Sequence, residues 1–209
     1  RRGDGVRLLD AADPELRSSS SSAVARAQVV AARAVSGAQP NQQEILAAID
    51  ADPQILVRSA RPGHLTGSGL VVDAAGERFV LLHHRKLQIW VQPGGHADGE
   101  ANLARVALDE CTEETGIDGL CVAAPAIDVD IHRVAPPSED PHVHYDLRFL
   151  VVAPAAASLQ PNHESTDGRW VGWDEVDSMP IDTGTQRLVA AGRRAVYELG
   201  EPPTRNELT

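Results

Sequence analysis

The stretch PGGHADGE at residues 93–100, followed by DECTEETGI at residues 109–117, carries the strongest indication of the fold. Residues 101–115 predict one helix, because apolar positions recur at helical spacing and Gly116 is a typical helix-terminating glycine. The glycine pair at 94–95 would let the backbone turn sharply and approach a ligand closely. The segment therefore predicts a glycine-rich loop followed by a helix with a defined end.

Three glutamates gather near the end of this predicted helix. At about 100° per residue, Glu110, Glu113 and Glu114 share one face of the helix. These anions repel one another and meet the negative end of the helix dipole, so stability alone would favour lysine or arginine there. A divalent cation would compensate, since hard cations prefer carboxylate oxygens. A solvated acidic helix face is the alternative. The opposite, apolar stripe consists of Ala101, Ala104, Leu108 and Cys111.

The spacing resembles the box of the Nudix hydrolases, which reads glycine, five residues, glutamate, seven residues, then R-E-U-x-E-E-x-G-U, where U is a bulky aliphatic residue. Segments 83–86, 94–99 and 144–149, together with Trp90, are similar to one branch of that family. The likeness covers roughly residues 63–176, and the N-terminal helical segment resembles the extension of this branch. The positions that match the box are Gly95, Glu110, Glu113, Glu114, Gly116 and Ile117.

The resemblance implies an α/β fold, an α/β/α sandwich with a mixed sheet. It also implies metal-dependent hydrolysis of a nucleoside diphosphate linked to another group, with water attacking a phosphorus atom. Magnesium is the expected cofactor and manganese the alternative ion. The expected metal-binding residues are Gly95, Glu110, Glu113 and Glu114, and the expected catalytic residues are Glu110, Glu113, Glu114 and Glu164.

Contacts to a nucleotide or other diphosphate substrate are expected from Gly95, His96, Arg85, Lys86 and Tyr145. Arg85 and Lys86 follow a predicted strand and would meet phosphates as a planar fork and a point charge, or remain solvated at the strand end. Tyr145, like Trp90, would stack on a base or belong to the core. Glu164 resembles a late loop glutamate of the family, with an ordinary surface glutamate as the alternative.

Two further histidines, His142 and His144, alternate along one predicted strand and therefore face the same way. This spacing can bind a metal ion, but the sequence spacing offers no third ligand. Substrate contact and simple surface placement are the alternatives.

Two positions depart from the box. Ala101 occupies the position of its first glutamate, with Glu100 beside it, and Asp109 replaces its arginine. In the family, that arginine is thought to help hold the helix carboxylates in place. Asp109 should raise the pKa of the neighbouring carboxylates, and Arg105, one turn earlier, is expected to pair with it. A weakened Nudix module that binds a nucleotide for regulation or sensing is therefore the alternative function, and an isomerase of the same fold is a third.

The rest of the chain predicts a helical N-terminal extension at residues 1–60 and a Nudix domain at 61–209 that includes a C-terminal helix. In the extension we expect helices at 23–35 and 42–49, the second capped by Asn41. The last helix is expected at 183–199. The expected strands lie at 69–72, 79–82, 87–91, 127–133, 144–152 and 169–173, with a weaker apolar stretch at 120–124.

Composition limits the partners. The 209 residues carry 19 basic and 30 acidic side chains, a net charge of −11, which disfavours a nucleic-acid duplex as partner. No apolar run approaches 18 residues, so we expect no membrane span, and we expect a cytoplasmic enzyme. The two cysteines, Cys111 and Cys121, are too few for a disulfide scaffold and are expected to be reduced. A homodimer is compatible with the sequence.

Overall fold

A computed structural model describes residues 6–33, 38–135 and 140–200. Its centre is an eight-stranded sheet in which six strands follow the order β1-β6-β7-β2-β3-β4, while β5 pairs with β2 and β8 pairs with β3. The strands are β1 (Arg7–Leu9), β2 (Gly63–Val72), β3 (Arg78–His84), β4 (Trp90–Val91), β5 (Gly94–His96), β6 (Cys121–Val134), β7 (His142–Val152) and β8 (Ser165–Gly172).

The sheet is mixed, as the resemblance to the Nudix family implies. Strands β2 and β7 run parallel, with Gly63 opposite Val143 and Val72 opposite Val152. The other paired strands are antiparallel. Because β3 pairs with β2 only at Phe79 and Val72, β5 takes its place beside the earlier half of β2. This arrangement brings the glycine-rich loop against the middle of the sheet.

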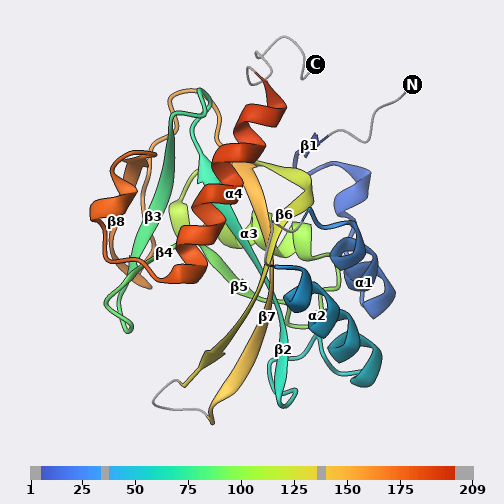
Figure 1. The fold of residues 1–209 in the computed structure, drawn as a ribbon. Helices are drawn as coiled ribbons and strands as arrows, with labels where there is room; N and C mark the ends of the chain where they lie inside the picture. The colour runs from blue at the N-terminus through green and yellow to red at the C-terminus, as the bar shows by residue number, and fades with distance from the viewer. Residues whose placement is uncertain (1–5, 34–37, 136–139, 201–209) are drawn as a thin grey trace.

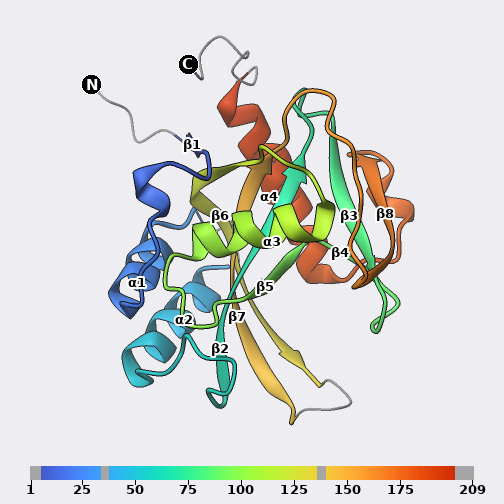
Figure 2. The ribbon, with the colours of Figure 1, turned by 180° about the vertical axis from the view of Figure 1, so that it is seen from behind.

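Helices cover both faces of the sheet, so the α/β/α sandwich is confirmed. Helix α4 lies on one face and α3 on the other, as the two opposite views show (Figures 1 and 2). The apolar core beneath α3 also includes α1 and α2, whereas α4 covers a second core. The helices are α1 (Ser22–Ala31), α2 (Gln39–Ala51), α3 (Leu103–Thr115) and α4 (Thr183–Leu199), with 3-10 turns at Pro14–Leu16 and Val176–Ser178. Among the described residues, none of these helices is long and apolar enough to span a bilayer.

Helix α3 packs directly on the sheet because two glycines of β2 lie beneath it. A Cβ atom at Gly67 would come within 2.7 Å of the Leu103 carbonyl oxygen, and one at Gly69 within 2.5 Å of the Cys111 sulfur. Any larger side chain at these positions would push the helix away from the sheet. The close approach fixes the height of the helix above β2 and β5.

The N-terminal helices differ from their predicted bounds. Helix α2 begins at Gln39, with Pro40 in its first turn, so Asn41 is not its cap. Proline is tolerated there because the first-turn amides have no partner within the helix. Helix α1 ends at Ala31, and the last predicted residues, 34 and 35, lie outside the described part. The extension also contributes β1, an edge strand paired with β6 that the helical expectation missed.

Other strand bounds change as well. The predicted strand 69–72 extends back to Gly63, and the predicted 169–173 becomes Ser165–Gly172. The stretches 120–124 and 127–133 belong to the single strand β6, whose pairing with β7 is irregular between Ala123 and Asp128. The predicted strand at 87–91 shortens to Trp90–Val91, because a turn with Gln88 at φ 56° occupies the preceding residues. The predicted C-terminal helix agrees residue for residue with α4.

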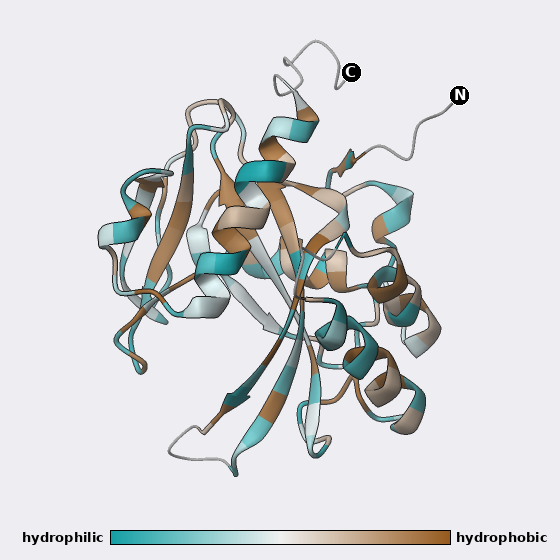
Figure 3. Cartoon of the chain, in the orientation of Figure 1, coloured by the Kyte–Doolittle hydropathy of each residue, from teal (hydrophilic) through white to brown (hydrophobic). Residues whose placement is uncertain are grey.

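The sheet face under α4 changes character along its length. It is apolar behind α4 and more hydrophilic towards the end of β6 and the start of β7 (Figure 3). At the transition, the buried Arg148 guanidinium forms ion pairs with Asp146 and Asp130, both at 2.8 Å. Arg187 of α4 reaches the same Asp130 at 2.6 Å. This buried network joins α4 to β6 and β7 and marks where the apolar core ends.

Candidate functional site

The carboxylate group, which we define as Glu110, Glu113 and Glu114, occupies the C-terminal half of α3. The Asn102 side chain accepts a hydrogen bond from the Arg105 amide at the start of this helix, and Gly116 ends it in the left-handed conformation at φ 65°. Glu110 and Glu114, one turn apart, are half-buried, whereas Glu113 is exposed. The predicted shared face is therefore present, with two carboxylates directed inward.

The glycine pair lies directly against these two carboxylates. A Cβ atom at Gly95 would overlap the carboxyl group of Glu110. The Gly94 amide donates a hydrogen bond of 3.1 Å to Oε2 of Glu114. Gly95 thus leaves room for the Glu110 carboxylate between α3 and the loop, and the Gly94 amide binds that of Glu114.

Crowding and burial change the acidity of both inward carboxyl groups. Burial raises the pKa of Glu110 to about 7, and the charge of Glu113 adds to the effect. Burial also raises the pKa of Glu114 to about 8, against the opposing hydrogen bond from Gly94. Burial thus shifts both groups toward the neutral form, and a nearby cation would oppose that shift. A set of crowded carboxylate oxygens fits a hard divalent cation such as Mg²⁺.

Glu164 lies close to this group because its loop is docked on the end of α3. The Gln160 amide donates to the Thr115 carbonyl at 2.8 Å, and the Asn162 amide donates to the Glu114 carbonyl at 3.2 Å. The exposed Glu164 carboxylate is one of the charges that raise the pKa of Glu110 and Glu114. The structure thus brings together the box carboxylates and the late loop glutamate.

Arg85 holds the same loop from the other side. Its Nε donates to the His163 carbonyl at 2.8 Å and its Nη2 to the Ser165 carbonyl at 3.2 Å, while its amide donates to the Glu164 carbonyl at 3.0 Å. The guanidinium therefore positions the loop. Lys86, its neighbour, is exposed on the turn after β3.

The aromatic candidates lie in the core. Tyr145 is 6% exposed and belongs to the apolar cluster beneath α2, so its ring offers no open face to a base. Trp90 is 8% exposed, with the Arg169 guanidinium 5.0 Å from its ring centroid. The core alternative therefore describes both rings, and the expected stacking contact from Tyr145 is wrong for this structure.

His96 faces away from the carboxylates. It lies opposite Thr66 of β2, on the sheet face of α4, whereas its neighbour Gly95 faces α3. Its ring lies 5.0 Å from the rings of His64 and His144, measured between centroids. We call His64, His96, His142 and His144 the histidine group.

The histidine group includes a residue that sequence analysis missed. His64 stands alone in the sequence, and only the parallel pairing of β2 with β7 places it opposite His144. Burial lowers the pKa of His64 to about 4 and that of His144 to about 3, and neighbouring imidazoles add to both shifts. The Ala60 carbonyl opposes the shift of His64 without forming a hydrogen bond of normal geometry. Both rings are therefore neutral at pH 7.

Comparison with known protein families shows to which family this chain belongs. The model of the NUDIX domain matches residues 63–203. The chain belongs to the Nudix family. Putative 8-oxo-dGTP diphosphatase 3 of two Mycobacterium tuberculosis strains, CDC 1551 / Oshkosh and H37Rv, is 33% identical over 134 residues, which cover 58% of this chain and 58% of each relative. The matched region thus spans little more than half the length of these curated relatives.

Solved structures show the same Nudix fold at low sequence identity. An Ap4A hydrolase binary complex from C. elegans superimposes with a TM-score of 0.52 and 17% identity, over 64% of this chain and 97% of that one. A hydrolase of the NUDIX family from Clostridium perfringens gives 0.51 and 18%, over 65% and 97%.

The two departures from the Nudix box have clear structural surroundings. Ala101 is fully buried, and its amide donates to the Ser19 carbonyl. The neighbouring Glu100 accepts hydrogen bonds from the amides of Ser19 and Asn102, at 2.9 and 2.7 Å. Although burial alone would raise the pKa of Glu100, these and other hydrogen bonds lower it. Glu100 therefore links the N-terminal extension to the start of α3 and takes no part in the carboxylate group.

Asp109, the second departure, faces solvent. Its side chain is 59% exposed and accepts an ion pair from Arg105 at 3.2 Å, as expected from their spacing. Its charge is nevertheless among those that raise the pKa of Glu110. Asp109 therefore affects the carboxylate group only through charge repulsion with Glu110. Among the described residues, no hydrogen bond or ion pair joins it to Glu110 or Glu114.

Proposed function

We propose that this Nudix protein is a metal-dependent hydrolase that cleaves the diphosphate linkage of a nucleoside diphosphate joined to another group. The observation that carries the proposal is the pair Glu110 and Glu114, held half-buried against the glycine pair with strongly raised pKa values. Such a pair is costly without a cation, and an oxygen-rich site of this kind suits Mg²⁺, with Mn²⁺ as the alternative.

In this proposal, Glu110, Glu113 and Glu114 hold the cation, together with Gly95. When bound, the cation supplies positive charge that offsets the charge building on the phosphate oxygens. Gly95 leaves the space for the Glu110 carboxylate, and the Gly94 amide fixes the orientation of Glu114. The chain thus provides a prearranged cradle that needs little movement when substrate binds.

Glu164 is the proposed general base. Its loop is docked on α3 through backbone hydrogen bonds, so its carboxylate can be held near the carboxylate group while remaining accessible to water. It would orient the attacking water and accept its proton as the new oxygen–phosphorus bond forms. The bond between that phosphorus and the bridging oxygen of the diphosphate breaks, and the bridging oxygen leaves on the other phosphate. Arg85 contributes by holding the loop, and Lys86 is the proposed phosphate contact because it is the exposed cation beside it.

His96 and Tyr145 leave the proposed set of substrate contacts. His96 lies on the opposite sheet face from Glu110, and Tyr145 is enclosed in the core. Base recognition must therefore come from other residues. The division into an extension at 1–60 and a Nudix domain at 61–209 remains our proposal, with the extension supporting the start of α3 through Ser19 and Glu100.

The experiment is a panel of nucleoside triphosphates, dinucleoside polyphosphates, nucleotide sugars and nucleotide alcohols, incubated with Mg²⁺ and analysed by chromatography. 8-oxo-dGTP belongs in the panel because the curated relatives are named as 8-oxo-dGTP diphosphatases. We expect cleavage of one class at its diphosphate linkage, and none after chelation of the metal. Binding without products from any class would overturn the enzyme and support the regulatory module.

A further inference from the structure

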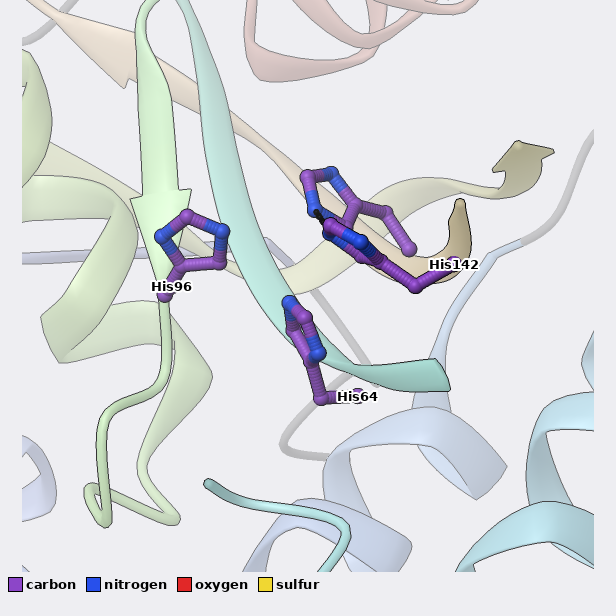
Figure 4. Close-up of side chains that lie close together, drawn as sticks. His64, His96 and His142 are labelled. Carbon is purple, nitrogen blue, oxygen red and sulfur yellow. Dashed lines mark hydrogen bonds between the residues drawn. The ribbon is translucent and has the colours of Figure 1, made fainter. Parts of the chain in front are cut away.

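The histidine group assembles from three strands that are distant in sequence. His64 comes from β2, His96 from β5, and His142 and His144 from β7. The rings of His64, His96 and His142 turn toward one common space (Figure 4). The space lies on the sheet face of α4, whereas the carboxylate group lies on the face of α3. The two groups are therefore separate features of the molecule.

The distances within the group suit a single small ion. One ring nitrogen from each of the four histidines lies within 4.8 Å of the other three. The Nε2 atoms of His142 and His144 are 3.2 Å apart. In a tetrahedral zinc site with bonds of about 2.0–2.1 Å, two ligand nitrogens lie about 3.3 Å apart. The closest pair already has this spacing, and the widest would need to close by roughly 1.5 Å, which rotation of the side chains can supply.

The buried ring of His64 lacks a hydrogen-bond partner among the described residues. The ring is 1% exposed, and neither Nδ1 nor Nε2 forms a hydrogen bond with any residue that the structure describes. A buried polar group without a partner is destabilising, and folded proteins rarely contain one. An ion in the common space would satisfy the nitrogen that points there.

His142 is already oriented as a ligand. Its Nδ1 lies 2.8 Å from the carbonyl oxygen of Asp140, which can only accept a hydrogen bond, so Nδ1 carries the proton. The Nε2 lone pair is then directed at His144 and the common space. Metal-binding histidines are commonly held in this way by a hydrogen bond from the other ring nitrogen.

A metal-free stack of hydrogen-bonded imidazoles is the competing explanation. Such a stack accounts for the contact between His142 and His144, but it leaves both nitrogens of His64 unbonded. Four imidazoles with no carboxylate in the ligand set suit a borderline transition metal, and zinc prefers four nitrogen or sulfur ligands in tetrahedral geometry.

We propose that His64, His96, His142 and His144 together bind one zinc ion in a four-coordinate structural site. The ion fixes β5 to β2 and β7 on the face opposite the carboxylate group. Because His96 follows Gly94 and Gly95 directly, the zinc site steadies the strand on which the inward carboxylates rest. The site does not depend on the hydrolase proposal, since none of its ligands belongs to the carboxylate group.

The test uses the full chain, stripped with a chelator and titrated with Zn²⁺ by calorimetry and with Co²⁺ by visible absorption. We expect saturation at one ion per chain and the intense Co²⁺ absorption typical of four-coordinate sites. His144→Gln should weaken zinc binding by more than about a hundredfold, since even residues that only orient a ligand cost 10–100-fold. His163→Gln, an exposed histidine outside the group, is the matched control and should bind as the original chain does.

Two further arms separate this site from the carboxylates and from loss of folding. The Glu113→Gln/Glu114→Gln double variant should keep the Co²⁺ spectrum, and zinc should raise its melting temperature. Circular dichroism tests whether His144→Gln is folded. If that variant is unfolded, His96→Gln takes its place, since His96 is also only half-buried. The proposal is overturned if the original chain gives no four-coordinate Co²⁺ spectrum, if the histidine variants bind zinc unchanged, or if the glutamate variant loses the spectrum.

Discussion

The carboxylate group contains crowded acids with raised pKa values, and the histidine group contains crowded bases with lowered pKa values. Both crowd like side chains into partly buried space, and in both burial shifts the pKa toward the neutral form. The pKa of Glu114 rises to about 8, while that of His144 falls to about 3. Oxygen atoms gather on the sheet face of α3 and ring nitrogens on that of α4. In our two proposals the carboxylate group therefore binds a hard cation, and the histidine group binds a borderline one.

The largest expected effect is on catalysis and belongs to the carboxylate group alone. Glu114→Gln removes a charged oxygen ligand while preserving the shape and the hydrogen-bond acceptor that faces Gly94. We expect kcat to fall by about a thousandfold, within the range lost when a positioned catalytic group is removed. Steady-state kinetics on the substrate found in the panel measures this.

The matched control for that variant is Glu77→Gln, an exposed carboxylate on the turn between β2 and β3. Its kcat should equal that of the original chain. Equal losses in both variants would mean that net charge, and not the carboxylate group, controls the rate.

Alanine substitutions at the two glycines of β5 should have different effects, one on activity and the other on stability. The three atoms nearest to a Cβ at Gly95 belong to the flexible end of Glu110, so Gly95→Ala should displace that carboxylate and lower kcat/KM about tenfold with little loss of stability. A Cβ at Gly94 meets the backbone of Ser68 at 2.8 Å, so Gly94→Ala should lower the free energy of unfolding by about 1–3 kcal/mol. Chemical denaturation and kinetics on both variants provide the measurement, and a stable, fully active Gly95→Ala would contradict the cradle.

In the metal-free protein, the carboxylate group should lower the free energy of unfolding at high pH, and the histidine group should lower it at low pH. The folded-state pKa values of Glu110 and Glu114, about 7 and about 8, exceed the ordinary value of 4.5. The folded chain then binds more protons than the unfolded chain, so stability falls as pH rises from about 4.5 to about 8. For His64 and His144 the folded-state values, about 4 and about 3, lie below 6.5, so stability falls as pH drops from about 6.5 to about 3.

Denaturation of chelated protein across this range measures both limbs. Glu114→Gln should flatten the alkaline limb and leave the acid limb unchanged, whereas His144→Gln should do the reverse. If each variant changed both limbs equally, the two groups would not be independent.

The smallest expected effect concerns a departure from the Nudix box. Asp109→Asn removes an exposed ion pair with Arg105 and one of several charges that act on Glu110. The free energy of unfolding should change by no more than about 0.5 kcal/mol, because exposed pairs of this kind contribute little. The rate should change less than about twofold. A tenfold loss of kcat would instead place Asp109 in the working site.

The carboxylate group could be predicted from the sequence because a single helix carries it. Helical geometry alone places Glu110 and Glu114 on one face, and the terminating glycine and the long periodic pattern fix the helix end. Helix α4 was equally accessible, because a long periodic segment indicates a helix clearly. The α/β/α sandwich with a mixed sheet was expected from the resemblance to the Nudix box.

The histidine group could be predicted only in part. The alternation of His142 and His144 was visible along one strand, but His64 and His96 join them through pairings of β2 with β7 and β5. Those contacts depend on the strand order, which local patterns do not specify. Short elements such as β1 and β5 were missed for the same reason, because their pairing partners and not their own residues define them.

Calorimetric titration with Mg²⁺ tests most directly the central claim that the carboxylate group is the cation cradle on which hydrolysis depends. The original chain, the Glu110→Gln/Glu114→Gln double variant and the Glu77→Gln control are compared at one pH, with the histidine group saturated with zinc beforehand. The account predicts Mg²⁺ binding by the original chain and the control, and loss of that binding in the double variant. Unchanged Mg²⁺ affinity in a folded double variant would contradict it.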